Sequence, residues 1–169
     1  MKKIVFFGGS GLLAVNWAKK ICHNYEVYLI MHKRKIELPD VNIIYFDENF
    51  EESFNFFVLE LRPDLMINCA ALTNVDLCES NRSMANHINT EWPKKLALLS
   101  KKIKAKFVHI STDHLFDGKK KIYDEGDQIS PLNQYAKTKA AAEKEVLLID
   151  KNALIVRTNF FGWGLSYRK

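Results

Sequence analysis

The sequence of 169 residues lacks long hydrophobic runs: its apolar stretches, such as residues 4–7 and 147–149, are far too short to cross a bilayer. It also shows no signal peptide, because Met1-Lys2-Lys3 leads directly into a short strand-like run and a glycine-rich turn. Both absences argue against a membrane protein and against a secreted one. We therefore expect a cytoplasmic protein with no membrane partner.

Cysteine is scarce, and Cys22, Cys69 and Cys78 form neither a paired framework nor a spacing that suits metal ligands. We therefore expect reduced thiols and no metal site. Charge of one sign is only mildly in excess, with a net charge of +5. The lysines of residues 101–106 and 119–121 suggest nucleic-acid binding, but no nucleic-acid motif interleaves with them. We predict that these lysines lie on solvated loop edges and that nucleic acid is not a partner.

The sequence does contain a regular alternation of apolar strand-like runs and amphipathic helix-like segments. Hydrophobic residues make up 47% and charged residues 27%, which is typical of one globular domain. Strands are predicted over residues 4–7, 26–31, 41–46, 65–68, 107–110 and 153–156, and helices over residues 12–22, 50–61, 83–100 and 133 or 134–148. This alternation indicates right-handed crossovers and an α/β fold with a parallel sheet.

A glycine-rich turn lies between the first predicted strand and the first predicted helix. Its sequence, Gly8-Gly9-Ser10-Gly11-Leu12-Leu13-Ala14, fits a dinucleotide-binding pattern in two registers, starting at Gly8 or at Gly9. Either register directs backbone amides and a helix N-terminus at a pyrophosphate, as in a Rossmann-type doubly wound sheet with helices on both faces. The alternative is a plain strand-to-helix turn. We predict cofactor contacts at Gly8, Ser10, Gly11 and Leu12.

The end of the second predicted strand normally contacts the adenosine ribose. Here it carries the basic run Met31-His32-Lys33-Arg34-Lys35 and no carboxylate. Basic residues suit a ribose 2′-phosphate, so Lys33 and Arg34 predict NADPH, with NADH as the alternative cofactor. The run could also be an ordinary basic surface loop. Asp47, which ends the third predicted strand, is a candidate for hydrogen bonding to adenine.

Tyr135 and Lys139 are four residues apart and therefore share one face of the last predicted helix. An ammonium group beside a phenol favours the phenolate, so we expect Lys139 to lower the pKa of Tyr135. A hydroxyl such as that of Thr112 could share a substrate oxygen with the phenol. This spacing alone is weak evidence, since any helix can carry it by chance, and its weight comes from the glycine-rich turn.

Four stretches of the sequence together match a known family. They are residues 7–14, residues 67–76 with Glu79-Ser80, residues 110–118 continuing through Tyr123 and Glu125 to residues 131–139, and Ile155-Val156-Arg157-Thr158. The third stretch, with Ser111-Thr112-Asp113 and Tyr135-Ala136-Lys137-Thr138-Lys139, is the most specific. On these residues the chain resembles the extended short-chain dehydrogenases, and among them the dTDP-4-dehydrorhamnose reductase group.

The resemblance implies a catalytic trio of Thr112, Tyr135 and Lys139, with Tyr135 as proton donor to the ketone of a nucleotide sugar. Lys139 would also hold the nicotinamide ribose, and Asn89 would support Lys139 through a water molecule. The residues expected to line the cofactor after the fourth strand are Ala70, Ala71 and Leu72. His109 and His114, which flank the threonine, are interpreted as structural rather than catalytic.

The resemblance also predicts that the substrate domain is largely missing. Residues 1–169 would form the NAD(P)-binding domain, with residues 159–169 as the start of a truncated substrate-binding region. The aromatic tail of Phe160, Phe161, Trp163 and Tyr167 would then be exposed and would favour a homo-oligomer or a partner chain. Activity of the chain alone is therefore not expected.

Three functions remain open at the level of sequence. The first is NADPH-dependent reduction of a 4-keto nucleotide sugar, as in dTDP-rhamnose biosynthesis. The second is an NADP-binding docking module that resembles the regulatory subunit of methionine adenosyltransferase. The third is a nucleotide-sugar epimerase or dehydratase, although dehydratases usually place an acidic pair where this chain has Asp113-His114.

Overall fold

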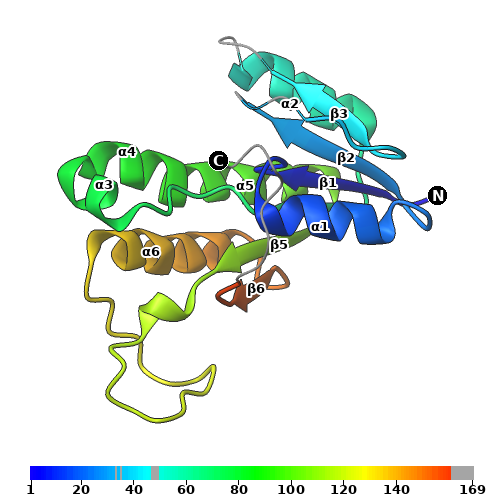
Figure 1. Ribbon diagram of the computed structural model, residues 1–169. Helices are drawn as coiled ribbons and strands as arrows, with labels where there is room; N and C mark the ends of the chain where they lie inside the picture. Colours follow the sequence, from blue (N-terminus) through cyan, green and yellow to red (C-terminus); the bar gives the residue numbers. More distant parts are fainter. Residues whose placement is uncertain (33, 35, 47–49, 161–169) are drawn as a thin grey trace.

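The computed structural model describes residues 1–32, 34, 36–46 and 50–160, and of residues 50–52 only the backbone. These residues build a six-stranded parallel sheet in the order β3-β2-β1-β4-β5-β6 (Figure 1). The strands are β1 (Lys3–Phe7), β2 (Glu26–Met31), β3 (Asn42–Tyr45), β4 (Leu65–Asn68), β5 (Lys106–Ser111) and β6 (Leu154–Arg157). The order reverses between β1 and β4, which confirms the predicted Rossmann-type topology.

The helices are α1 (Leu12–Ile21), α2 (Phe50–Leu61), α3 (Val75–Ser80), α4 (Arg82–Asn86), α5 (Trp92–Ile103) and α6 (Gln134–Ile149). The single α-helix predicted over residues 83–100 was wrong. A π-helical segment, His87–Glu91, separates α4 from α5, and α5 continues to a left-handed Lys104. Helix α3 and the short 3₁₀ helix Asp113–Leu115 were not predicted from the sequence, because both are too short to show helical periodicity.

The two faces of the sheet bury two separate hydrophobic clusters. On β1, Val5 and Phe7 point into one cluster, and Ile4 and Phe6 point into the other, as the pleat of a strand requires. Phe7 meets the ring of Trp92 from α5 on its side, whereas Phe6 meets Trp17 from α1 on the opposite side. Helices therefore cover both faces, as predicted for a doubly wound sheet.

The parallel strands end at a common edge, and the segments after β1, β4 and β5 meet there. The glycine-rich turn follows β1, residues 69–74 follow β4, and residues 112–115 follow β5. Ligands of doubly wound sheets bind at this carboxyl edge, beside the point where the strand order reverses. Lys33, Asp47, Phe161, Trp163 and Tyr167, singled out from the sequence, lie outside the described residues.

Over the described part of the chain, no helix is long and apolar enough to cross a membrane. Within the same residues, no three histidine, cysteine or acidic side chains are grouped so that they could hold a metal ion.

Candidate active site

The glycine-rich turn packs directly against the segment that follows β4. Gly8 has a φ of +74°, and a Cβ atom at this position would lie 2.7 Å from both the nitrogen and the Cα of Ala70. A Cβ at Gly9 would lie 2.9 Å from the Cβ of Leu29. Because real Cβ atoms do not approach other atoms so closely, both positions require glycine. The Gly11 amide donates to the Gly8 carbonyl over 2.9 Å, which closes the turn.

The first turn of α1 presents backbone amides at this edge. Gly11 is the N-cap residue in an extended conformation, so the helix has no capping side chain at this position, and no acidic residue lies in its first turn. A helix N-terminus of this kind attracts an anionic group such as a pyrophosphate. Beyond β2, both His32 and Arg34 are exposed.

A cavity of about 230 Å³ lies between the carboxyl ends of β4 and β5 and the first turns of α6. Its lining includes the three predicted catalytic residues Thr112, Tyr135 and Lys139 together with Ala71. It also includes Ser111, whose buried hydroxyl is the one buried side-chain polar atom without a partner among the described residues. An orphaned hydroxyl is costly to bury. The orphaned hydroxyl and the closely packed glycine turn fit a polar, elongated ligand such as a nicotinamide dinucleotide.

Helix α6 carries Tyr135 and Lys139, and two side chains fix where this helix begins. Asn133 is the N-cap residue and accepts a 2.8 Å hydrogen bond from the Ala136 amide. Glu79 of α3 accepts a 2.7 Å hydrogen bond from the Gln134 amide. A carboxylate at a helix N-terminus is electrostatically favourable. Tyr135 is thereby held in the first helical turn, at the mouth of the cavity.

Tyr135 is half-buried, and the pKa of its phenol is raised from the ordinary value of 10.0. Burial is the largest cause, and the thiol of Cys78 and the carboxylate of Asp113 add to it, while a hydrogen bond with Thr112 lowers the pKa. Lys139 does not contribute to this shift. The predicted lowering of the phenol pKa by Lys139 is therefore not what this structure shows, and Tyr135 is a protonated donor at neutral pH.

Lys139 is 1% exposed, and its ammonium group is surrounded by protein. Its Nζ donates to the Ile110 carbonyl over 2.7 Å and lies 3.2 Å from Nε2 of His109. Burial lowers the pKa of Lys139 from 10.5 to about 8, although Glu143 and, to a lesser extent, Cys69 act to raise it. The lysine therefore titrates close to neutral pH.

Asn89 lies in the π-helical segment and is completely buried. Its Oδ1 accepts from the Leu72 amide over 2.7 Å, and its Nδ2 donates to the Leu72 carbonyl and to the Thr138 hydroxyl, both over 3.1 Å. Asn89 thus holds the segment after β4 against α6 at Thr138, which is the residue before Lys139. A π-helical turn inside a helix often marks a functional site. Support of Lys139 by Asn89 through water stays a prediction.

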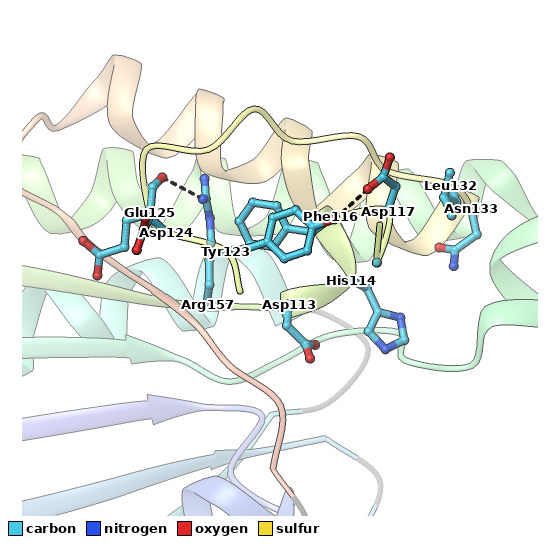
Figure 2. Close-up of a pocket in the computed structure, with 11 residues that line it drawn as sticks. Asp113, His114, Phe116, Asp117, Tyr123, Asp124, Glu125, Leu132, Asn133 and Arg157 are labelled. Carbon is cyan, nitrogen blue, oxygen red and sulfur yellow. Dashed lines mark hydrogen bonds between the residues drawn. The ribbon is translucent and has the colours of Figure 1, made fainter. Parts of the chain in front are cut away.

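A second and larger pocket, of about 610 Å³, opens beside the catalytic cavity and shares Asp113 and His114 with it (Figure 2). The ring of His114 meets that of Tyr135 edge-on, with 5.9 Å between centroids. The pocket is rich in carboxylates and aromatic rings, and its remaining lining residues are Phe116, Asp117, Gly118, Tyr123, Asp124, Glu125, Leu132, Asn133 and Arg157.

Arg157, at the end of β6, anchors the loop that forms this pocket. Its Nε and Nη2 bind the Glu143 carboxylate over 2.8–3.1 Å, its Nη1 donates to the Glu125 carbonyl over 3.1 Å, and its guanidinium lies 5.5 Å from the Phe116 ring. Phe116 stacks on Tyr123 with 4.4 Å between centroids. The sequence analysis assigned no role to Arg157, although its place in the fourth stretch was a signal.

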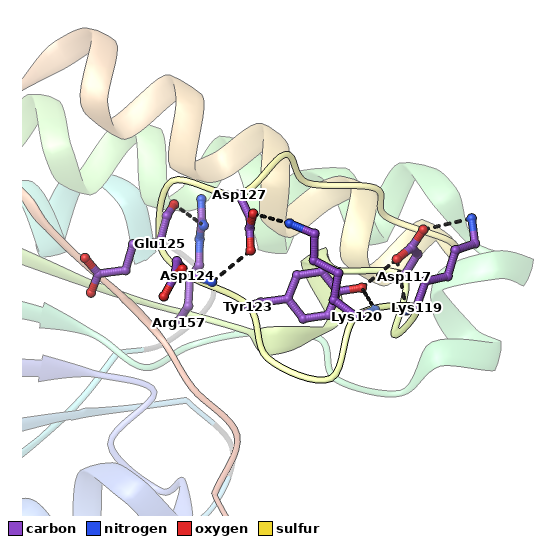
Figure 3. A network of polar contacts seen from close by, with 8 residues as sticks. All are labelled: Asp117, Lys119, Lys120, Tyr123, Asp124, Glu125, Asp127 and Arg157. Atoms are coloured by element: carbon purple, nitrogen blue, oxygen red, sulfur yellow. Dashed lines mark hydrogen bonds and ion pairs between the residues drawn. The ribbon is translucent and has the colours of Figure 1, made fainter.

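The tip of the same loop is cross-linked by ion pairs and hydrogen bonds (Figure 3). The Tyr123 hydroxyl donates to Asp117 over 2.7 Å, Lys119 pairs with Asp117 over 2.9 Å, and Lys120 pairs with Asp127. The bond from Tyr123, followed by those from Lys119, lowers the pKa of Asp117 to about 2. Lys119 and Lys120 are therefore paired within the loop.

Comparison with known proteins agrees with this geometry. The model of the RmlD substrate binding domain family matches residues 1–164. The spore coat polysaccharide biosynthesis protein SpsK of Bacillus subtilis is 32% identical over 169 residues, covering 98% of this chain and 56% of SpsK. The chain thus spans about half the length of this relative.

Two solved structures have the same fold. A hypothetical dTDP-4-dehydrorhamnose reductase from Sulfolobus tokodaii is 32% identical with a TM-score of 0.82, covering 93% of this chain and 55% of that one. The dTDP-4-dehydrorhamnose reductase from Bacillus anthracis, solved in complex with NADP, is 30% identical with a TM-score of 0.71, covering 93% of this chain and 53% of that one. With a family match over nearly its whole length, the chain belongs to the RmlD substrate binding domain family.

Proposed function

We propose that the chain carries the cofactor-binding and catalytic portion of an NADPH-dependent reductase of 4-keto nucleotide sugars. The observation that carries this proposal is the meeting of Thr112, Tyr135 and Lys139 in one cavity beside the glycine-rich turn. The relatives support it, since one is a hypothetical dTDP-4-dehydrorhamnose reductase and another is a dTDP-4-dehydrorhamnose reductase solved in complex with NADP. Because those proteins are about twice as long, the complete reaction would involve residues beyond this sequence.

The residues that would hold the cofactor surround the carboxyl edge of the sheet. The turn at Gly11 and the amide of Leu12 would receive the pyrophosphate, and Arg34, with Lys33, would receive a 2′-phosphate. Further cofactor contacts are proposed at Gly8, Ser10, Ala70, Ala71, Asn89 and Asp47. When bound, NADPH supplies the hydride for carbonyl reduction.

The protein residues would supply the proton and the orientation of the sugar. Tyr135 would donate its phenolic proton to the sugar carbonyl oxygen, because burial keeps this phenol protonated at neutral pH. The hydroxyl of Thr112, buried beside it, would hold the same oxygen in line. Lys139, which lines the cavity, would donate hydrogen bonds to the ribose hydroxyls of the cofactor. Each of these steps uses atoms that already line the cavity.

The test is NADPH oxidation in the presence of 4-keto nucleotide sugars, followed by absorbance. It is run on the chain alone and on the chain fused to the carboxyl-terminal portion of a full-length reductase. Tyr135→Phe should slow turnover in the fusion by about 10²–10⁴-fold, the usual range for a general acid, while cofactor affinity stays nearly unchanged. Tyr25→Phe, at the opposite edge of the sheet, is the matched control.

Two outcomes would decide against the proposal. A Tyr135→Phe fusion with full turnover would remove Tyr135 from the chemistry. Tight cofactor binding with no turnover of any 4-keto sugar in the fusion would favour the docking module instead.

A further inference from the structure

A fully buried row of polar side chains lies behind the catalytic cavity and joins three elements of the fold. Asn68 ends β4, His109 lies within β5, and Lys139 belongs to α6; their exposed fractions are 0%, 0% and 1%. Asn68 Nδ2 is 3.0 Å from His109 Nδ1, and His109 Nε2 is 3.2 Å from Lys139 Nζ. The proposed reaction assigns no task to Asn68 or His109.

The orientation of the Asn68 amide follows from a backbone group. The Ala70 amide lies 3.1 Å from one end of the Asn68 side chain. A backbone N–H can only donate, so that end must be the oxygen Oδ1. The other end, Nδ2, therefore faces Nδ1 of His109, and Nδ2 can only donate.

The position of the proton on His109 follows in turn. Burial lowers the pKa of His109 well below 6.5, and Lys139 lowers it further when it is protonated, so the ring is neutral at pH 7. A neutral imidazole has one donor nitrogen and one acceptor nitrogen. Since Nδ1 accepts from Asn68, the proton is on Nε2, and this N–H points at Lys139.

A nitrogen that faces an N–H donor must offer a lone pair, and only the neutral amine of lysine has one. We propose that Asn68 and His109 are positioning residues that stabilise the neutral amine of Lys139 and so ease the loss of its proton in the chain without cofactor. In this arrangement Lys139 Nζ accepts from His109 Nε2, donates to the Ile110 carbonyl over 2.7 Å, and keeps one N–H for the cavity. The assignment of Lys139 to an active site rests on the proposed function.

Charging Lys139 requires a concerted rearrangement. The ammonium group would need a lone pair on His109 Nε2, so the ring proton would move to Nδ1. The Asn68 amide would then have to turn its oxygen toward Nδ1, which breaks the bond from the Ala70 amide. The two protonation states of Lys139 are thus linked to two hydrogen-bond arrangements of the strands β4 and β5.

The other titratable groups around Lys139 do not set its protonation state in this way. From α6, Glu143 faces Lys139, but its carboxylate is bound by Arg157 of β6. From the segment after β4, the Cys69 thiol faces Lys139, and burial raises the pKa of that thiol to about 12, so it is neutral. Tyr135, in the same cavity, has a raised pKa and is also neutral at pH 7. His109 is therefore the neighbour whose proton position decides the state of Lys139.

The first experiment reads the histidine tautomer directly from long-range ¹H–¹⁵N correlation spectra of the chain without cofactor. The His109 signals are assigned by their loss in His109→Gln, which separates them from the other four of the five histidines. We expect a ring that is neutral on both sides of the pH of about 6.5 at which histidine normally titrates. Its proton should be on Nε2 above the Lys139 pKa of about 8, where the lysine is a neutral amine. A proton on Nδ1 above that pH, or an ordinary titration, overturns the proposal.

The second experiment reverses the arrangement with Asn68→Asp. A carboxylate accepts from both the Ala70 amide and His109 Nδ1, so the ring proton should move to Nδ1 and the pKa of Lys139, about 8 in the unaltered chain, should rise toward 10.5. This pKa is followed by ¹³C-labelled lysine, assigned with Lys139→Met. Asn89→Asp adds the same charge to a buried asparagine that does not contact His109, and it should leave the tautomer unchanged.

If Asn68→Asp does not fold, His109→Gln provides the same test, because a glutamine amide can turn its oxygen toward Lys139 and should also raise the lysine pKa. An unchanged Lys139 pKa in every folded variant overturns the proposal. Neither measurement uses cofactor or sugar. The proposed function can therefore fail in its turnover assay while this arrangement stands, and the reverse also holds.

Discussion

The two halves of the carboxyl edge of the sheet are built on opposite principles. Around Gly8 and Gly9 the structure depends on the absence of side chains, since a Cβ at either position would collide with β2 or with the segment after β4. Around β5 and α6 it depends on buried polar side chains, among them His109, Asn89 and Lys139. The first half offers backbone amides to a ligand, and the second offers titratable groups.

The difference shows where each half is vulnerable. Close backbone packing tolerates no added side-chain atom, but it buries no polar side chain that needs a hydrogen-bond partner. Buried polar groups are stable only when each finds a partner, so losing one member leaves another unsatisfied. Substitutions in the catalytic half should therefore have the larger effects, and the following predictions test this in order of expected size.

The largest effect on stability is expected for Arg157→Ala. Glu143 is 7% exposed at its side chain, and removing its bidentate partner leaves a buried carboxylate unpaired. Breaking such a pair costs about 3–5 kcal/mol, which chemical denaturation would measure. Arg157→Lys keeps the charge without the bidentate geometry and should lose less. A loss below about 0.5 kcal/mol for Arg157→Ala, the size of an ordinary surface substitution, would show that the loop does not depend on this anchor.

A pH-dependent effect is expected from Lys139. Its folded-state pKa of about 8 lies below its ordinary value of 10.5, so between these values the unfolded chain binds more protons and stability rises with pH. The destabilisation is fully present below pH 8 and disappears as pH rises toward 10.5. Relative to the unaltered chain, Lys139→Met should therefore become less stable by about 3 kcal/mol across that window. If the stabilities of the two proteins changed with pH in parallel, the pKa of Lys139 would be the same in the folded and the unfolded chain.

In the glycine half, Gly8→Ala should be compared with Gly118→Ala. Both residues have left-handed φ values, +74° and +73°, but a Cβ at Gly118 meets nothing within 4 Å. Gly118→Ala should cost only the backbone strain of about 1–2 kcal/mol. Gly8→Ala should cost about 1–3 kcal/mol more, because of the collision with Ala70. Equal unfolding free energies for the two variants would mean that the close approach at Ala70 has no energetic role.

The smallest effect is expected at the exposed tip of β2. Arg34→Ala should weaken NADPH binding by about 1.5- to five-fold, as for an exposed charge pair, and leave NADH binding unaffected. Fluorescence quenching titrations with both cofactors would measure this, with the exposed Lys20→Ala on α1 as control. Loss of affinity for both cofactors alike would argue against a 2′-phosphate contact at Arg34.

The sequence by itself determined the features that depend only on residues close together in the chain. Apolar periodicity and turn residues placed all six strands and the helices α1, α2 and α6 to within a few residues, because strand and helix periods are local properties. The glycine-rich turn and the spacing of Tyr135 and Lys139 are local in the same way. They predicted the Rossmann-type topology and a shared helix face for Tyr135 and Lys139, whereas the trio with Thr112 was implied by the family resemblance.

Only the tertiary structure decided the contacts that join distant segments. His109 contacts Asn68 across 41 residues and Lys139 across 30, so no spacing in the sequence relates them. The same holds for Arg157 with Glu143 and for Asn89 with Leu72, and for the π-helical segment whose geometry directs Asn89 inward. The protonation of a buried side chain depends on desolvation and on its partners. Both arise only when the sheet and helices have packed, which is why the raised pKa of Tyr135 and the low pKa of Lys139 could not be read from the sequence.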